Sequence, residues 1–180
     1  MIMDIDKLIL QKEIEDCKKC KLGKGFKSFG WGDKDSSIIF IGSNPTQRIK
    51  ENRLCFQSNT IKPLFRALLE LGYKSKDFYF TNKVKCPTPK NRVPMKKETT
   101  LCESFLQHEL DVVKPKIIIC LGKYTSVEYG IPKMYTGIYI GEHSEVKVYL
   151  FPHPSYINRF PKNYEKFKKC LGVILNNAKI

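Results

Sequence analysis

Short apolar runs rich in β-branched residues alternate with longer segments of helical periodicity along most of this chain. The runs predict strands at residues 37–41, 78–84, 116–121 and 146–151. The periodic segments predict helices at residues 4–16, 60–71, 98–113 and 163–175. Such alternation is typical of a parallel sheet with helices on both faces. We therefore expect an α/β fold, a three-layer α/β/α sandwich with a short, mostly parallel central sheet.

The chain has the length of one domain. Its 180 residues contain no repeat, low-complexity tract or linker, so we expect a single domain spanning residues 1–180. No run of about 18 apolar residues is present, and charges interrupt the N-terminal apolar stretch. The sequence therefore predicts neither a membrane span nor a signal peptide, and we expect an intracellular, cytoplasmic monomer.

The charge balance is strongly basic. There are 32 lysines and arginines against 18 acidic residues, for a formal net charge of +14. An excess of this size favours a polyanionic partner, nucleic acid before an anionic membrane, although a solvated lysine-rich surface has the same composition.

Polar motifs lie late in one of the predicted strands and directly after two others. They are Gly42-Ser43-Asn44-Pro45, Thr81-Asn82 and His153-Pro154-Ser155. In an open parallel sheet the ligand lies outside the carboxyl ends of the strands. We therefore expect these three motifs to meet at one edge of the sheet and to form the binding site.

The chain has seven cysteines, an odd number for a disulfide framework. Clustered cysteines in a reducing compartment more often bind metal. Four of them supply enough thiolates for either a [4Fe–4S] cluster or a tetrahedral zinc ion, and spacing alone does not separate the two: Cys17, Cys20, Cys86 and Cys102. The other three are expected to be structural: Cys55, Cys120 and Cys170.

The ordered set of motifs resembles the uracil-DNA glycosylase superfamily, and the cysteine pattern resembles its iron–sulfur branch, family 4. The matching stretches lie at residues 42–45, 56, 81–86, 91–94, 102, 115–122 and 153–156. The resemblance implies a monofunctional DNA glycosylase that flips out a deaminated base, most simply uracil, and hydrolyses its N-glycosidic bond in base excision repair. It also favours a [4Fe–4S] cluster over zinc, and DNA containing a deaminated base as the partner.

The first motif departs from the iron–sulfur branch, which typically has Gly-Glu-Ala-Pro-Gly. Here Ser43 and Asn44 precede the proline and Thr46 follows it. An asparagine at this place is similar to mismatch-specific, single-strand-selective and hypoxanthine-DNA glycosylases. Three alternatives stay open: a hypoxanthine or xanthine glycosylase, a low-turnover uracil-DNA binding or damage-sensing module, and, more remotely, an iron–sulfur protein that binds RNA.

Two residues are candidates for catalysis. The imidazole of His153 can donate a hydrogen bond to the base carbonyl as negative charge develops there. The amide oxygen of Asn44 can orient a water molecule but cannot take its proton as a carboxylate would. The simpler interpretations are a histidine that caps a turn and an Asx turn before Pro45.

A flipped base needs an aromatic ring to stack on and polar groups to read its edge. The resemblance assigns the ring to Phe56 and the reading of the edge to Asn82, with Gly42 and Ser43 completing the base site. Phe56 could instead belong to the core, and Asn82 could simply end a strand.

The segment after the last strand is expected to contact DNA. The resemblance places Ser155, Tyr156 and Arg159 in a loop that pinches the DNA backbone. It also makes Ile157 the side chain that wedges into the stack after the base has left.

Overall fold

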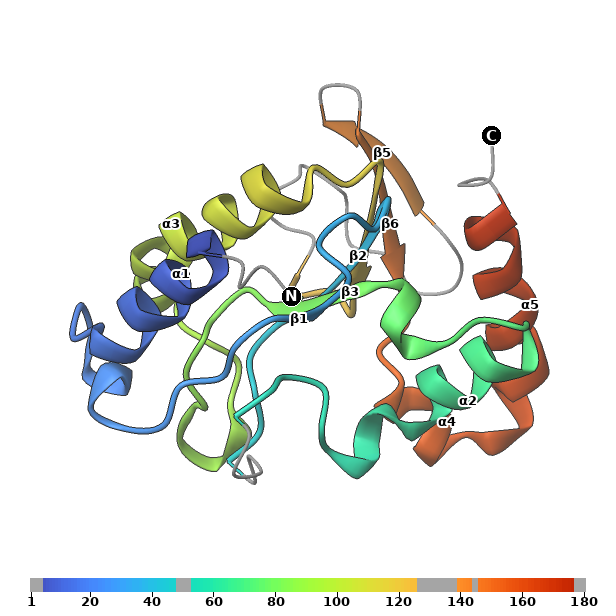
Figure 1. Cartoon of the computed structure of the whole chain (residues 1–180). Coiled ribbons are helices and arrows are strands. Elements are labelled where there is room, and N and C mark those ends of the chain that lie inside the picture. Colours follow the sequence, from blue (N-terminus) through green and yellow to red (C-terminus); the bar gives the residue numbers. More distant parts are fainter. Residues whose placement is uncertain (1–4, 48–52, 126–138, 144–145, 177–180) are drawn as a thin grey trace.

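The described part of the chain forms one six-stranded sheet with helices on both faces (Figure 1). The structure is a computed structural model that describes residues 5–47, 53–125, 139–143 and 146–176. The strands are β1 (Trp31–Gly32), β2 (Ile38–Gly42), β3 (Tyr79–Asn82), β4 (Ile117–Leu121), β5 (Tyr139–His143) and β6 (Val146–Phe151).

The strand order is β1-β3-β2-β4-β6-β5. The four inner strands are parallel, while β1 and β5 pair antiparallel at the two edges. The expected mostly parallel sheet is confirmed. The two edge strands were not predicted, because neither contains an unbroken apolar run: β1 has two residues, and β5 contains glycine and glutamate.

The helices are α1 (Ile5–Asp16), α2 (Lys62–Glu70), α3 (Lys96–Val113), α4 (Ser155–Arg159) and α5 (Tyr164–Asn176). Figure 1 shows α1 and α3 on one side of the sheet and α2, α4 and α5 on the other. The three-layer sandwich is therefore confirmed. Within the described residues, no helix combines the length and the apolar character that crossing a membrane requires.

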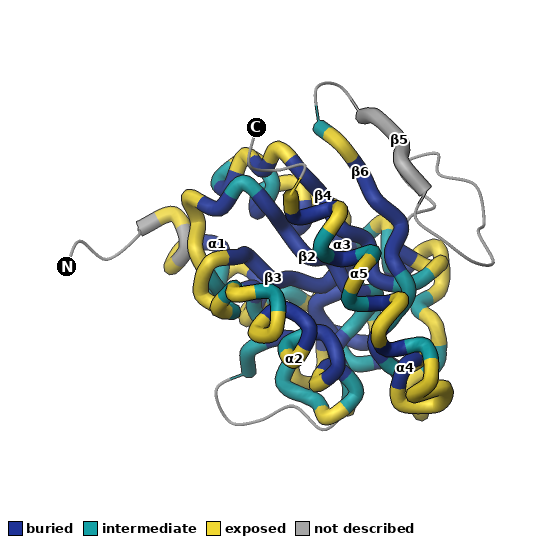
Figure 2. The backbone as a smooth tube through the Cα atoms, turned by 90° about the vertical axis from the view of Figure 1, so that its right-hand side faces the viewer, coloured by how far each residue is buried: buried dark blue, intermediate teal, exposed yellow. Residues whose placement is uncertain are grey.

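The core follows from the alternation of side chains along the strands. In β2, Ile38 and Phe40 pack into the cluster that includes α2 and α5, whereas Ile39 and Ile41 pack into the cluster that includes α3. Figure 2 shows the inner strands as the buried centre of the molecule. Both faces of β2 are buried, which explains why its sequence is an unbroken apolar run.

Two helix starts differ from the sequence expectation. Thr60 does not cap α2: residues 59–61 form a 3₁₀ turn, and the hydroxyl of Thr60 pairs with that of Ser58 at 2.6 Å. Helix α3 begins at Lys96 and not at Glu98, because the Glu98 carboxylate accepts the backbone N–H of Met95 at 2.8 Å and caps the first turn.

The register of the strands brings the three polar motifs to one edge. Gly42 pairs with Asn82 at the ends of β2 and β3. The pairing continues beyond the strands, since the N–H of Val84 donates to the carbonyl of Ser43 at 2.9 Å. On the other flank of β2 in the same sheet, the N–H of Gly122 after β4 donates to the carbonyl of Phe151 at the end of β6. Phe151 lies two residues before His153. The expected convergence of the motifs is therefore observed.

Candidate active site

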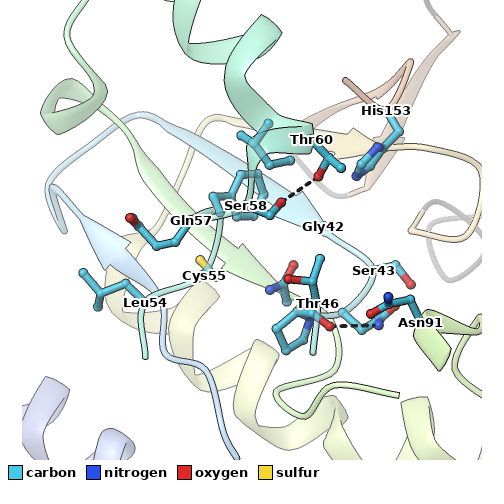
Figure 3. Close-up of a pocket in the computed structure, with 15 residues that line it drawn as sticks. Gly42, Ser43, Thr46, Leu54, Cys55, Gln57, Ser58, Thr60, Asn91 and His153 are labelled. Atoms are coloured by element: carbon cyan, nitrogen blue, oxygen red, sulfur yellow. Dashed lines mark hydrogen bonds between the residues drawn. The ribbon is translucent and has the colours of Figure 1, made fainter. Parts of the chain in front are cut away.

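A pocket of about 170 Å³ lies at the carboxyl edge of the sheet. Its walls come from the segment after β2, from residues 54–61, from the end of β3 and from the loop after β6 (Figure 3). All the side chains that the sequence predicts for catalysis and base binding line this pocket: Gly42, Ser43, Asn44, Phe56, Asn82 and His153.

Asn82 presents an unused hydrogen-bond donor in the pocket. Its side chain is 4% exposed, and its Nδ2 has no hydrogen-bond partner among the described residues. Gly42 makes room for this amide, because a Cβ at residue 42 would lie 2.4 Å from the Asn82 Oδ1 and 3.3 Å from the Phe56 ring. A buried donor without a protein partner is left to pair with water or with a ligand in the pocket.

Phe56 is held in the left-handed region of the backbone, with a φ of 60°. That conformation is unusual for a bulky residue and is typical of functional sites, where the surrounding structure supports the strain. The ring packs at 5.4 Å and a tilt of 53° against Phe80, which belongs to the core below the pocket. Phe56 is thus both the edge of the core and a wall of the pocket.

The hydrogen bonds of His153 fix its tautomer. The backbone N–H of Ser155 donates to Nδ1 at 3.1 Å, so Nδ1 is an acceptor, and the Ser155 hydroxyl lies 2.8 Å from the same atom. The ring proton of the neutral imidazole is therefore on Nε2, which makes Nε2 a donor. Burial, and secondarily the positive charge of Arg159, lower the pKa of His153, and both effects favour the neutral form.

The amide of Asn44 uses its Nδ2 in two hydrogen bonds. It donates to the carbonyl of Pro45 and to the hydroxyl of Thr88, each at 3.2 Å. The Oδ1 is left as the acceptor of this side chain. The Asx-turn interpretation is therefore incomplete, because the amide also bonds to a loop 44 residues away.

Several pocket residues were not identified from the sequence. Ser58 and Thr60 place a hydroxyl pair in the wall, and Gln57 and Asn91 add amides (Figure 3). They lie in irregular segments without a motif. A sequence signal exists only for Asn91, which belongs to one of the stretches that carry the resemblance.

The four cysteines of the predicted metal site surround a second, smaller cavity, between α1, α3 and the chain after β3: Cys17, Cys20, Cys86 and Cys102. Within the described residues, no three His, Cys, Asp or Glu side chains form a group that could hold a metal ion. The segment that carries Cys17 and Cys20 is tied to α3. The Lys19 ammonium, which lies between these two cysteines in the sequence, donates to the Ser104 hydroxyl at 3.1 Å and lies over the Phe105 ring.

The electrostatics of the free thiols reflect their burial. Burial, followed by the charges of the neighbouring cysteines, raises the pKa of Cys86 to about 12. Burial also raises the pKa of Cys102, whose sulfur accepts the backbone N–H of Lys85 at 3.3 Å. A bound metal, which requires thiolates, would have to overcome this cost of deprotonation.

A sequence profile of the uracil-DNA glycosylase superfamily matches residues 29–175, which include the pocket residues and two of the four cysteines. The chain belongs to the uracil-DNA glycosylase superfamily. The resemblance seen in the motifs is therefore confirmed.

Several curated relatives carry the name type-4 uracil-DNA glycosylase, and three of them show the extent of the similarity. The one from Archaeoglobus fulgidus is 32% identical over 117 residues, covering 64% of this chain and 59% of the relative. The one from Sulfurisphaera tokodaii is 32% identical over 162 residues, covering 81% of this chain and 73% of the relative. The one from Saccharolobus solfataricus is 35% identical over 129 residues, covering 70% of this chain and 59% of the relative. The match thus spans between 59% and 73% of the length of these relatives.

The predicted DNA contacts of this superfamily member lie on α4, which the sequence had suggested to be a loop. Tyr156 is 37% exposed, and Arg159 is also exposed at the end of the helix. Ser155 is a partner of His153. Since the Ser155 hydroxyl donates its hydrogen to Nδ1, it is not free to donate to a phosphate in this arrangement.

The assignment of Ile157 as the side chain that wedges into the DNA stack stays a prediction, and without DNA this side chain is buried. Its side chain is only 5% exposed and belongs to the hydrophobic core beneath α4. A one-turn helix that packs against α2 must bury one side, and Ile157 lies on that side. The exposed aromatic rings of α4 and its end are instead Tyr156 and Phe160, whose centroids lie 5.0 Å apart.

Proposed function

We propose that this chain is a monofunctional DNA glycosylase that hydrolyses the N-glycosidic bond of uracil in DNA and leaves an abasic site for base excision repair. The observation that carries the proposal is the buried, unpartnered Nδ2 of Asn82 in the pocket. Uracil offers a carbonyl acceptor at the place on its ring where cytosine has an amino donor. A donor from the protein therefore favours uracil over cytosine.

The other pocket residues supply the remaining tasks of the reaction. The Phe56 ring offers a stacking surface to a flipped base. The Nε2–H of His153 donates to the base carbonyl as the leaving base becomes an anion, in a site where its neutral form is favoured. The Oδ1 of Asn44 accepts a hydrogen bond from the attacking water and aims its oxygen at the anomeric carbon.

A second candidate function rests on Asn44. An amide does not accept the proton of the water, so hydrolysis could be slow enough for the protein to act as a binder of deaminated bases. The sequence of this first motif is also similar to that of hypoxanthine-DNA glycosylases. Hypoxanthine and xanthine are therefore tested beside uracil.

We propose DNA as the partner on the basis of charge as well as of the pocket. The net charge of +14 favours association with phosphates, and the exposed Arg159 lies on the short helix that follows His153. Such binding releases counterions and weakens as salt is added. A base in a duplex also has to be flipped out of the stack before the pocket can enclose it.

We further propose that Cys17, Cys20, Cys86 and Cys102 hold a [4Fe–4S] cluster. Two observations support this proposal: the four cysteines line one cavity, and the backbone N–H of Lys85 donates to the Cys102 sulfur. When bound, the cluster would tie α1 to α3 and to the chain after β3. The pocket residues alone carry out the proposed hydrolysis.

The test of the function is excision from oligonucleotides that contain one uracil, hypoxanthine or xanthine, in single strands and in duplexes. Abasic sites are cleaved with alkali and resolved on a gel. We expect uracil to be removed, with hypoxanthine as the next substrate, and the same preparation of His153→Ala to be nearly inactive. Tight binding of one base without any excision would instead support the binding module.

Metal analysis tests the cofactor. Anaerobically purified protein should be brown and contain about four irons per chain, as four-cysteine ligation of a cubane requires. Removal of the metal by chelation should expose α1 to proteolysis. One zinc per chain and no iron would contradict the cluster.

A further inference from the structure

The two Nδ2 hydrogens of Asn44 are directed at two acceptors, and the second of them belongs to a residue that does not line the pocket. One is the carbonyl of Pro45, and the other is the hydroxyl of Thr88, which lies in the loop between β3 and α3. The orientation of a primary amide depends on such partners, because its oxygen and nitrogen have nearly the same shape. The partner of Nδ2 therefore decides which end of Asn44 faces the pocket.

Thr88 can act only as an acceptor toward Asn44. Its side chain is fully buried, and its Oγ1 donates its one hydrogen to the carbonyl of Arg92 at 2.5 Å. A flipped Asn44 would place Oδ1 against an oxygen that has no hydrogen left to donate. The hydroxyl of Thr88 thus selects the orientation in which Nδ2 faces the loop.

The loop that carries Thr88 is itself fixed on both sides. The Gln47 side chain donates to the carbonyl of Thr88 at 3.3 Å, which ties the loop to the first motif. Arg92 forks onto the buried carboxylate of Glu98 with distances of 2.7 and 2.8 Å, which ties the loop to the first turn of α3. A charge-assisted, bidentate contact of this kind has a defined geometry.

We infer that Thr88 is a positioning residue for the reaction: it fixes the Asn44 amide with Oδ1 toward the pocket, where the attacking water is held. This inference rests on the proposed function, because it assigns a role to Thr88 only through Asn44. Thr88 itself touches neither the base nor the water. Its effect should therefore vanish when the Asn44 amide is removed.

The test is a double-mutant cycle on single-turnover excision of uracil, with Thr88→Val, Asn44→Ala and the double variant. Valine keeps the shape of threonine and removes the hydroxyl. Thr88→Ser retains the hydroxyl, and Thr88→Ala replaces valine if the valine variant does not fold. Thr99→Val is the matched control, since its hydroxyl also donates to a backbone carbonyl, that of Lys96 at 2.7 Å, and has no contact with Asn44.

We expect Thr88→Val to slow excision about ten- to a hundredfold, the scale of a displaced catalytic group. Thr88→Ser and Thr99→Val should stay within about threefold of the wild-type rate. The double variant should likewise stay within about threefold of the rate of Asn44→Ala. The loss of the bond to Arg92 is present in both backgrounds, so the cycle cancels a merely structural effect.

Two outcomes would overturn the inference alone. One is excision by Thr88→Val at the wild-type rate. The other is a slowing of equal size in the wild-type and Asn44→Ala backgrounds, which would give Thr88 a structural role. Failure of the wild-type protein to excise any deaminated base would overturn the proposed function, and the inference with it.

Discussion

Two groups of buried polar side chains lie at the end of β3, and they differ in how completely they are paired. In the first, the Lys85 ammonium donates to the Thr81 hydroxyl, to the carbonyl of Asn82 and to the Glu109 carboxylate at 2.5–2.8 Å. All three ammonium hydrogens have acceptors. In the second group, in the pocket, the Nδ2 of Asn82 has no partner among the described residues.

The two groups have different roles: the Lys85 network supports the fold, and the Asn82 side chain is available to recognise a ligand. A fully paired buried network fixes the backbone of Asn82 from behind, since Lys85 bonds directly to its carbonyl. The side chain of the same residue, which lines the pocket, keeps an unsatisfied donor. We therefore expect substitutions in the network to reduce stability and substitutions in the pocket to reduce activity.

The largest effect is expected for Lys85→Met. It would leave the Glu109 carboxylate buried without its cation, and both side chains of the pair are 1% exposed. Breaking such a pair by removing one partner lowers the free energy of unfolding by about 3–5 kcal/mol. Urea unfolding at equal metal content measures this change.

The double variant Lys85→Met, Glu109→Gln should recover most of the lost stability, because no unpaired charge is left behind. Lys76→Met serves as the matched control on the exposed surface. Equal urea midpoints for Lys85→Met and Lys76→Met would show that the buried network does not support the fold.

His153→Ala tests the pocket side of the comparison. It should slow single-turnover excision by about 100-fold or more, the scale for removing one donor to a developing anion. The urea midpoint and the affinity for DNA should change little, because the side chain is a pocket wall and not part of the core. An unchanged rate would remove His153 from the reaction.

The pH dependence of excision gives a second test of the same residue. Protonation of Nδ1 would put a hydrogen against the N–H of Ser155, so the charged ring cannot keep its orientation. Because burial and Arg159 lower the pKa of His153, the rate should hold as the pH falls through 6.5, its ordinary value, and drop only below the lowered pKa. His153→Ala should lack this drop.

Much of the sheet could be predicted because the inner strands are buried on both faces and therefore have unbroken apolar sequences. The positions of the polar motifs followed from the rule for parallel sheets. The edge strands could not be predicted, since β1 is the pair Trp31–Gly32. The direction of the Ile157 side chain also depends on how α4 packs against the core, and no local pattern encodes that.

The supporting contacts of the site were beyond sequence reasoning for a related reason. Lys85 and Glu109 are 24 residues apart, and Asn44 and Thr88 are 44 apart. In the sequence, Lys85 counts as one more basic residue and Thr88 as one more loop residue. Only the fold shows that both are buried and paired.

Asn82→Ala should have a smaller effect than His153→Ala on uracil but a larger one on selectivity. Removal of the unpartnered donor should slow uracil excision about tenfold and reduce the preference for uracil over cytosine, which rests on a hydrogen bond that the wrong base cannot make. The ratio of the excision rates on the two bases measures this. Unchanged selectivity would show that another group reads the base.

The smallest effect is expected for Arg159→Ala. Arg159 is exposed at the surface and also acts on the pocket residue His153 through its charge. If Arg159 contacts a phosphate, its loss should weaken binding to all DNA sequences alike and reduce the salt slope by about 1. Its charge also lowers the pKa of His153, so the acid limb of excision should move upward in pH toward 6.5. Lys162→Ala removes a neighbouring exposed charge and is the control: it should at most alter the salt slope. A shift of the acid limb in Arg159→Ala alone would show that this charge adds to burial in lowering the pKa of His153, whereas equal pH profiles would leave burial as the whole cause.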